Sequence, residues 1–338
     1  SAVTAPAPRP TRGRAVSVRG KQRGKLFAWP LLIGLVATAG LIVLSLFVGV
    51  YDVFGAEDGR QMFFTTRVPR TIALVLAGAA MAVSGLVMQQ ITQNRFVEPT
   101  TAGTTEWAGL GLLLVMILMP EASLLTKMVG AVLAAFAGTM VFFAVLRKVR
   151  LRSSIIVPIV GMMLGSVVGA VSTYIALSTD MLQSMNSWFL GSFTSVLKGQ
   201  YEPLWIVLAV LIAVFIASDR FTLAGLGPDI STNVGLNYER VILLGTGLIA
   251  IATGVVTVVV GNLPFLGLIV PNIVSLFRGD DLRSNLPWVA LMGVATVTVC
   301  DITGRVIVMP FEIPVSTILS ILGAFVFIFL LFRQRRRG

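Results

Sequence analysis

The sequence is dominated by a series of apolar runs, each close to the roughly 20 residues that an α-helix needs to cross a bilayer. Hydrophobic residues make up 56% of the 338 positions and charged residues only 12%, whereas a soluble domain carries roughly 25% charged residues. The runs are approximately 28–50, 70–92, 99–119, 124–146, 154–177, 203–218, 241–260, 264–277, 286–308 and 312–332. The pattern predicts one all-α, polytopic membrane domain over 27–338, with about ten transmembrane helices.

Two segments depart from the simple run pattern. The eighth run, 264–277, is short for a span and contains Pro271, which is expected to divide it. We expect this run to form either a half-helix or a tilted, buried segment. Between the fifth and sixth runs, QSMNSWFLGSFTSVLKG (183–199) is amphipathic and too short to span. We expect this stretch to form an interfacial helix.

The basic residues indicate the orientation of the chain. Ten spans place both termini on one side, and with cytoplasmic termini twenty of the 26 Lys and Arg residues lie inside. The six outer ones are Arg60, Arg67, Arg70, Lys127, Lys198 and Arg305. This bias predicts a multi-pass protein of the cytoplasmic membrane with both termini cytoplasmic. The basic residues lie between apolar spans and form no continuous face, so the net charge of +11 does not indicate nucleic-acid binding.

The first 26 residues are rich in Pro, Arg and Gly and contain few apolar side chains. Such a segment cannot bury enough apolar surface to fold, so we expect a disordered basic cytoplasmic tail. The following run, 28–50, is too long for a signal-peptide core and is not followed by a small-residue cleavage pattern. It is therefore interpreted as the first membrane helix.

The loop after the sixth run, SDRFTLAGLGPDISTNVGLNYER (218–240), is longer than a simple connection needs. Its apolar residues recur at helical spacings of three, four and four, and they are Leu223, Leu226, Ile230 and Val234. Pro228 suits the start of a helix and Gly235 suits a C-terminal cap. The pattern predicts two very short helices with one apolar face at the cytoplasmic surface.

Two partners could cover that apolar face. A helix lying on lipid headgroups usually carries basic residues, but this loop has no Lys and only Arg220 and Arg240, near its ends. An apolar face with a near-neutral rim is better suited to a groove in another protein. We therefore expect a cytoplasmic protein to dock here.

Several motifs resemble one known family. RVPRTIALVLAGAAMAVSGLVMQQITQNRFVEPTTAGTTEWAGLG (67–111), GNLPFLGLIVPNIVSLFRGDDLRSNLP (261–287), DITGR (301–305) and FEIPVSTILSILGAFVFIFLLFR (311–333) resemble, in order, signatures of permeases of iron–siderophore ABC importers, the family that includes the cobalamin permease. The resemblance implies an ABC importer permease fold of ten helices. It also implies a second permease subunit, two cytoplasmic ATPase subunits that bind ATP and Mg, and an extracytoplasmic siderophore-binding protein.

The resemblance also assigns roles to particular residues. The 219–239 loop would be the coupling element that fits into the ATPase. Asn94 and Phe96, with Ser153 and Ser154, would form the cytoplasmic gate, although ordinary helix capping explains the two serines as well. Arg67, Arg70 and Arg305 would receive acidic residues of the binding protein. Lipid phosphates are the alternative partner of these arginines, and Asp301 is the alternative partner of Arg305.

The motifs depart from the common family pattern at two places. The segment NRFVEP stands where NP-L-A-x-P is usual, and Pro271-Asn272 stands where Pro-His is usual. Both forms resemble the branch that imports ferric catecholate siderophores such as enterobactin and petrobactin, and they argue against cobalamin or haem. That branch commonly pairs two different permease chains, so a heterodimer is expected.

The chain carries little chemistry of its own. It contains no G-x-x-x-x-G-K-[ST] motif, no His and one Cys, so neither ATP hydrolysis, a cofactor nor a metal site is expected in it. Glu106 and Trp107, in the third run, are open to two interpretations, helix packing or lining of the translocation path. The alternative function is an autonomous proton-coupled secondary transporter, which would need more acids within its spans than this chain has.

Overall fold

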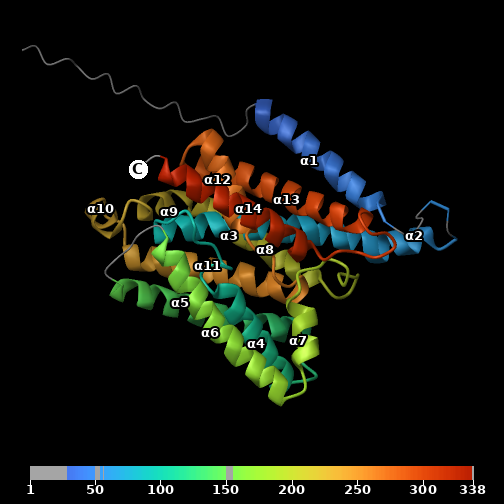
Figure 1. Cartoon of the computed structure of the whole chain (residues 1–338). Helices are drawn as coiled ribbons and strands as arrows, with labels where there is room; N and C mark the ends of the chain where they lie inside the picture. The colour runs from blue at the N-terminus through green and yellow to red at the C-terminus, as the bar shows by residue number, and fades with distance from the viewer. Residues whose placement is uncertain (1–28, 50–53, 56, 150–154, 337–338) are drawn as a thin grey trace, which may run out of the picture.

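The computed structural model describes residues 29–49, 54–55, 57–149 and 155–336. The predicted basic tail (1–26) and the predicted gate residues Ser153 and Ser154 lie outside this part of the chain. All regular structure within it is helical, as predicted (Figure 1). The elements are α1 (Trp29–Phe47), α2 (Gly59–Met62), the π-helical η1 (Phe63–Arg67), α3 (Val68–Thr92), α4 (Thr104–Leu118), α5 (Leu124–Lys148), α6 (Ile156–Ser178), α7 (Leu182–Phe189), the 3₁₀-helical η2 (Glu202–Trp205), α8 (Ile206–Ile216), α9 (Ser218–Ala224), α10 (Pro228–Asn233), α11 (Tyr238–Val259), α12 (Leu266–Arg278), α13 (Leu282–Val306) and α14 (Val315–Arg335).

Each of the ten predicted runs corresponds to one helix in the described residues. Seven spans are long and apolar enough to cross a membrane, and η2–α8 with α9 forms an eighth that is bent by 63°. The other two runs correspond to α4 and α12, which are shorter apolar helices of 15 and 13 residues. The prediction of about ten membrane helices is therefore confirmed.

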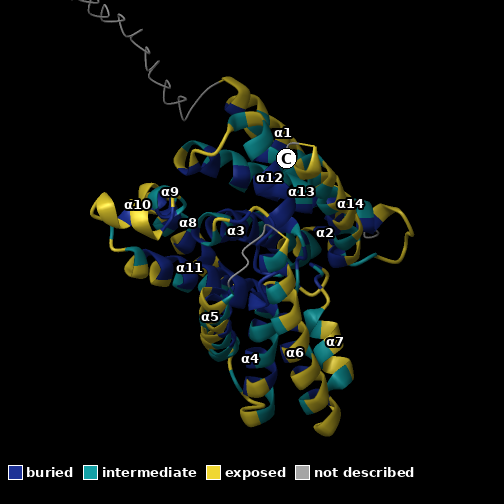
Figure 2. Ribbon diagram, turned by 60° about the vertical axis from the view of Figure 1, so that its left-hand side comes forward, coloured by how far each residue is buried: buried dark blue, intermediate teal, exposed yellow. Residues whose placement is uncertain are grey.

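Helix α3 lies at the centre of the fold and is almost wholly buried (Figure 2). It packs against α8, α11, α12 and α13, and its small side chains let these neighbours approach closely. A Cβ added to Gly85 would lie 2.1 Å from the Gly267 carbonyl oxygen of α12. A Cβ added to Gly293 of α13 would lie 2.6 Å from the Gly78 oxygen. Glycine at these positions allows α3 to contact both helices through the backbone.

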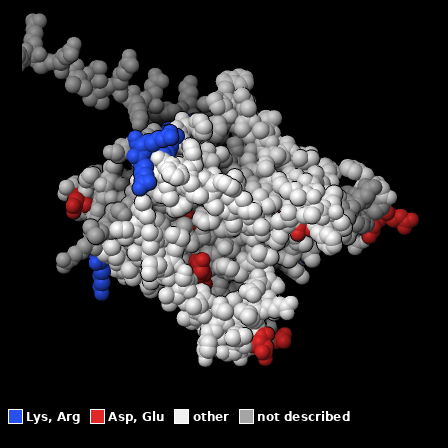
Figure 3. All heavy atoms as spheres, in the orientation of Figure 1, with Lys and Arg blue, Asp and Glu red and all other residues white. Residues whose placement is uncertain are grey.

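The remaining helices surround this centre. Helices α4, α5 and α6 pack together beside α11, and α1 lies along α13 (Figure 1). Helices α9 and α10 lie at one end of the molecule with the C-terminal end of α14, and α2 lies at the other end. We call these ends the α10 end and the α2 end. Lys and Arg gather near the end of α14 on the face drawn in Figure 3, whereas the middle of that face shows no Lys or Arg and only small patches of Asp or Glu.

Three helix boundaries differ from the predictions. The second span begins near Gly59 instead of residue 70, through α2 and the π-helical η1, where Phe63 stacks on Phe47 of α1 with ring centroids 5.8 Å apart. The third begins at Thr104 instead of residue 99, because Gly103 has φ +83° and stops the helix from extending backwards. The interfacial helix is limited to α7, which ends at Phe189.

The expected division at Pro271 is wrong, because α12 continues through this residue, but the expectation of a buried segment is confirmed, since most of α12 is buried. Proline has no N–H, so the Gly267 carbonyl one turn earlier has no intrahelical donor. Gln89 Nε2 of α3 donates to that oxygen at 3.0 Å. Asn272 supports the same turn by donating to Leu268 O at 2.7 Å and to Arg95 O at 2.8 Å. Side chains thus satisfy the backbone around a proline that sequence alone suggests is a break.

Candidate functional site

The segment between α8 and α11 folds into two short helices, as predicted. Helix α9 is anchored by Phe221, which is completely buried, and α10 begins at Pro228 after Gly227, which has φ +103°. Ser231 Oγ lies 2.6 Å from both Leu223 O and Gly227 O, so it ties α10 to the end of α9. We call residues 218–235 the α9–α10 segment.

This segment presents an apolar stripe to the surface. Leu226, Ile230 and Val234 are 53%, 51% and 62% exposed, whereas Leu223 is half-buried. Gly235, at φ +92°, follows the stripe and reverses the chain toward α11. Three exposed apolar side chains on a short segment that is anchored by a buried Phe221 could fill an apolar groove in another protein.

The predicted gate residues of the α3–α4 connection lie beside a cavity of about 360 Å³ at the α10 end. Asn94 and Phe96 are buried, and Asn94 Oδ1 accepts a hydrogen bond from Phe96 N at 2.8 Å. Phe96 also makes an edge-to-face contact with Phe327 of α14, with ring centroids 5.6 Å apart. The cavity is lined by Gln93, Asn94, Arg95, Phe96, Asn272, Leu276, Leu330, Arg333 and Gln334.

The same connection contains a buried acid that the sequence analysis missed. Glu98 is completely buried, its Oε1 accepts from Thr101 N at 3.2 Å, and Thr101 Oγ1 accepts from Glu98 N at 2.9 Å. Glu98 Oε2 has no hydrogen-bond partner among the residues that the structure describes. The reciprocal pair closes the turn that precedes α4, and the E-P-x-T order in the sequence was the signal that could have identified it.

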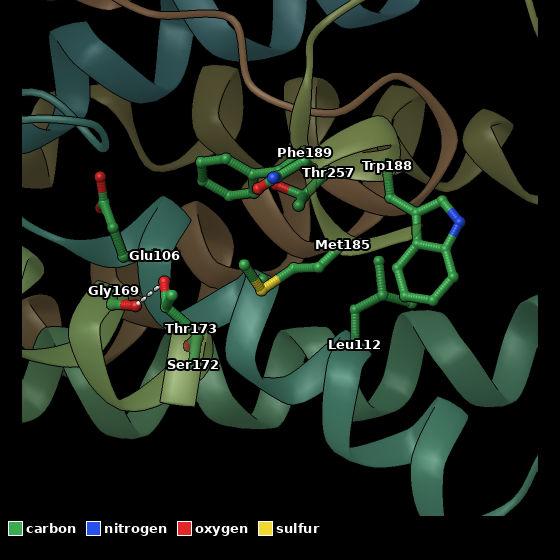
Figure 4. A pocket seen from close by; sticks show the side chains of 11 residues that line it. Glu106, Leu112, Gly169, Ser172, Thr173, Met185, Trp188, Phe189 and Thr257 are labelled. Carbon is green, nitrogen blue, oxygen red and sulfur yellow. Dashed lines mark hydrogen bonds between the residues drawn. The ribbon is translucent and has the colours of Figure 1, made fainter. Parts of the chain in front are cut away.

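The two path candidates on α4 have different surroundings. Trp107 packs against α5, where a Cβ added to Gly138 would lie 2.0 Å from its ring. Glu106 lines a cavity of about 240 Å³ between α4, α6 and α7. In Figure 4 it stands at one side of the group, with Phe189 and Met185 in the middle and Trp188 and Leu112 on the other side. The structure thus favours packing for Trp107 and cavity lining for Glu106.

Two of the three predicted docking arginines belong to a buried ionic cluster at the α2 end. Arg70 donates to both carboxylate oxygens of Asp301, at 2.8 and 3.2 Å, and to Glu312 at 3.1 and 3.2 Å. Arg305 Nε donates to Asp301 Oδ2 at 3.0 Å, and a second of its nitrogens donates to the same oxygen. We call Arg70, Asp301, Arg305 and Glu312 the Asp301 cluster.

The three arginines differ in what they can offer to a partner. Arg305 is 1% exposed and also donates to Ser45 O of α1 at 2.7 Å, so the structure favours its alternative role as the ion-pair partner of Asp301. The Arg70 side chain is 13% exposed. Arg67 is nearly buried and donates to Val48 O. Of the cluster, the Glu312 side chain is the most exposed, at 27%.

Comparison with known proteins assigns the chain to a family. Residues 29–333 match the model of the FecCD transport family. The chain belongs to the FecCD transport family. This FecCD chain is 57% identical over 312 residues to the petrobactin import system permease protein FatD of Bacillus anthracis, with 92% of the chain and 93% of that protein covered. It is 42% identical to the petrobactin import system permease protein YclN of Bacillus subtilis, with 87% and 95% covered.

More distant matches agree with this assignment. The FecCD chain is 32% identical to the vitamin B12 import system permease protein BtuC of Escherichia coli, with 82% of the chain and 86% of that protein covered. A solved structure described as an inward-facing conformation of a putative metal-chelate type ABC transporter superposes with a TM-score of 0.76 at 24% identity, with 90% and 99% covered. This likeness confirms the ABC importer permease fold that the motifs predicted.

Proposed function

We propose that this FecCD chain is the permease subunit of an ATP-driven importer that carries a ferric siderophore, of the catecholate type that includes petrobactin, across the cytoplasmic membrane. The 57% identity with a petrobactin permease over nearly the whole of both chains carries the proposal. The chain forms part of the translocation path and catalyses no covalent step. ATP and Mg bind to two ATPase subunits, and a binding protein delivers the cargo to the α2 end. Both termini and the α10 end face the cytoplasm.

The substrate is tested by uptake into proteoliposomes that contain the complete complex. We expect radioactive iron to enter with ferric petrobactin, more slowly with ferric enterobactin, and cobalamin to be excluded. Uptake should stop when ATP is withheld and continue when an ionophore removes the proton gradient. Uptake that follows the proton gradient and ignores ATP would support the secondary-transporter alternative.

The α9–α10 segment is proposed to dock the ATPase. Leu226 and Ile230 present half-exposed apolar side chains, so Leu226→Asp or Ile230→Asp would force a charge into the groove and should weaken ATPase association by roughly 100-fold, from ~3 kcal/mol of lost burial and desolvation. Thr232→Asp adds the same charge at an exposed position of α10 two residues from Ile230, on the opposite helix face, and is the matched control. Co-purification that is normal in all three variants would exclude this docking site.

Arg67 and Arg70 are proposed to receive acidic residues of the binding protein at the α2 end. Reversing either charge should slow docking, with the effect weakening as salt rises. Arg67 is nearly buried and Arg70 pairs with Asp301 and Glu312, so docking rates are compared between variants whose unfolding midpoints match that of the wild type. A reversed charge on the binding protein should restore the rate. Docking rates at low ionic strength that are unchanged in Arg67→Glu and Arg70→Glu would indicate lipid anchoring instead.

A second, different permease subunit is proposed to complete the translocation path. The exposed face of α6 includes Ser166, Ala170 and Thr173, small residues of the kind that are enriched where transmembrane helices pack together. Asn94 and Phe96 are proposed to close this path at the α10 end, together with Ser153 and Ser154. Cysteines placed at Ser153 and at the matching residue of the partner should crosslink in the closed state only. Crosslinking that ignores the nucleotide state would favour simple helix capping for Ser153.

A further inference from the structure

The end of α3 meets three other parts of the molecule through three glutamines. Gln89 reaches α12 by its hydrogen bond to Gly267 O. Gln90 reaches the C-cap of α9, since a Cβ added to Gly225 would lie 2.2 Å from Gln90 Oε1. Gln93 reaches the N-cap of α10, since a Cβ added to Gly227 would lie 3.7 Å from both side-chain polar atoms of Gln93. The two glycines that bound the α9–α10 turn thus each face a glutamine of α3.

Gln93 also has an unusual backbone conformation. It is the C-cap of α3 with φ +53° and ψ +36°, the left-handed region that residues with a Cβ adopt at some cost. Its N–H donates to Gln90 O at 3.2 Å, and the next N–H, of Asn94, donates to Gln89 O at 3.1 Å. Glycine is the usual residue at such a cap. A glutamine here retains a long amide side chain that glycine would lack.

Gln93 lines two cavities. Gln93 lines the 360 Å³ cavity that it shares with Asn94 and Phe96. It also lines a cavity of about 260 Å³ that it shares with Pro228 at the start of α10 and with Tyr238 at the start of α11. A residue that borders free space can be displaced by α10 without first compressing a packed core.

Motion of Gln93 would reach the gate directly. Asn94 follows it in the chain and holds Phe96 N at 2.8 Å, and Asn272 of α12 holds Arg95 O. The short connection is thus held together from Asn94 to Phe96 and is tied to α12 at Arg95, so a shift of Gln93 would act on it as one piece. We infer that Gln93, supported by Gln90, is the positioning residue that transmits displacement of the α9–α10 segment to the Asn94–Phe96 gate. This inference rests on the proposed coupling function of that segment.

The test compares two substitutions that both suit the left-handed backbone. Gln93→Gly keeps the cap and removes the side chain, whereas Gln93→Asn keeps the cap and a shorter amide. In the complete reconstituted complex, Gln93→Gly should leave ATPase association, thermal stability and ATP hydrolysis intact. Transport per ATP should fall roughly 2- to 30-fold, the range seen for mutations along coupling networks, and Gln93→Asn should recover part of it. Transport per ATP in Gln93→Gly that stays within about twofold of wild type overturns the inference, as does loss of assembly, which would make Gln93 a folding residue.

A cargo-free measurement separates this inference from the proposed function. Gln334 lines the gate cavity, and Cys300, the single native cysteine, is buried. Maleimide labelling of Gln334→Cys should change rate when ATP and vanadate are added, and the change should vanish in the Gln93→Gly background. A change of equal size in both backgrounds would refute the link. Failure of the wild-type complex to carry any siderophore would refute the proposed function alone.

Discussion

Asp301 should be the most sensitive polar position in the fold. Its side chain is 3% exposed and accepts hydrogen bonds from Arg70 and Arg305, both held within the membrane domain. Replacement by Asn keeps the shape of the side chain but removes its negative charge. The two buried guanidinium groups of Arg70 and Arg305 then lose the carboxylate that both of them contact. Arg70 retains Glu312 at 3.1 Å and Arg305 retains Ser45 O at 2.7 Å. Removal of one partner of a buried ion pair costs about 3–5 kcal/mol, so a comparable loss is expected for Asp301→Asn.

The matched control is a salt bridge of similar length at the surface. Arg95 and Asp280 lie 3.1 Å apart, but their side chains are 58% and 64% exposed. Solvent screens such a pair, so Asp280→Asn should cost no more than ~0.5 kcal/mol. At ~2 °C per kcal/mol for a chain of this size, Asp301→Asn should lower the midpoint of thermal unfolding by roughly 6–10 °C and Asp280→Asn by roughly 1 °C.

The assay is thermal unfolding of the purified complex in lipid nanodiscs, followed by tryptophan fluorescence at low and high salt. The Asp301→Asn shift should persist in 1 M salt, where the Debye length is about 3 Å, because the cluster excludes solvent. Replacing Asp301 by Leu together with Arg305 by Met removes this ion pair, leaves Arg70 paired with Glu312, and should recover most of the loss. Equal shifts for Asp301→Asn and Asp280→Asn, or abolition of the Asp301→Asn shift by salt, would refute the reasoning.

Two further outcomes follow from backbone contacts. Gly85→Ala should lower the unfolding midpoint sharply, because its Cβ would lie 2.1 Å from the Gly267 oxygen, which is backbone and cannot rotate away. Gly40→Ala, with no atom within 4 Å of the new Cβ, should leave the free energy of unfolding unchanged or raise it by about 0.5–1 kcal/mol. Equal effects of Gly85→Ala and Gly40→Ala would contradict the close α3–α12 contact. Gln89→Ala should cost about 1 kcal/mol by leaving the Gly267 carbonyl unpaired, and much less in a Pro271→Ala background where the restored N–H replaces it. A double-mutant cycle on unfolding free energies measures this coupling, and additive effects would argue against it.

Sequence alone determined the features that depend on local pattern. Ten helices follow from apolar run length, because a chain in lipid has to satisfy its backbone hydrogen bonds within each segment. The two short helices of the α9–α10 segment follow from helical spacing punctuated by Gly225, Gly227 and Gly235. The Asp301–Arg305 pair follows from a spacing of four residues on one helix, and it is present.

Tertiary structure decided which distant residues complete these patterns. The partners of Arg70 lie 231 and 242 positions further along the chain, and the donor that keeps α12 continuous at Pro271 lies on another helix, at Gln89. The second span extends back to Gly59, and Phe63 in that extension packs on Phe47 of α1. In each case the local pattern left a charge, a carbonyl or an aromatic ring without a partner. Only the folded chain, where burial makes an unpaired polar group costly, brings the partner within reach.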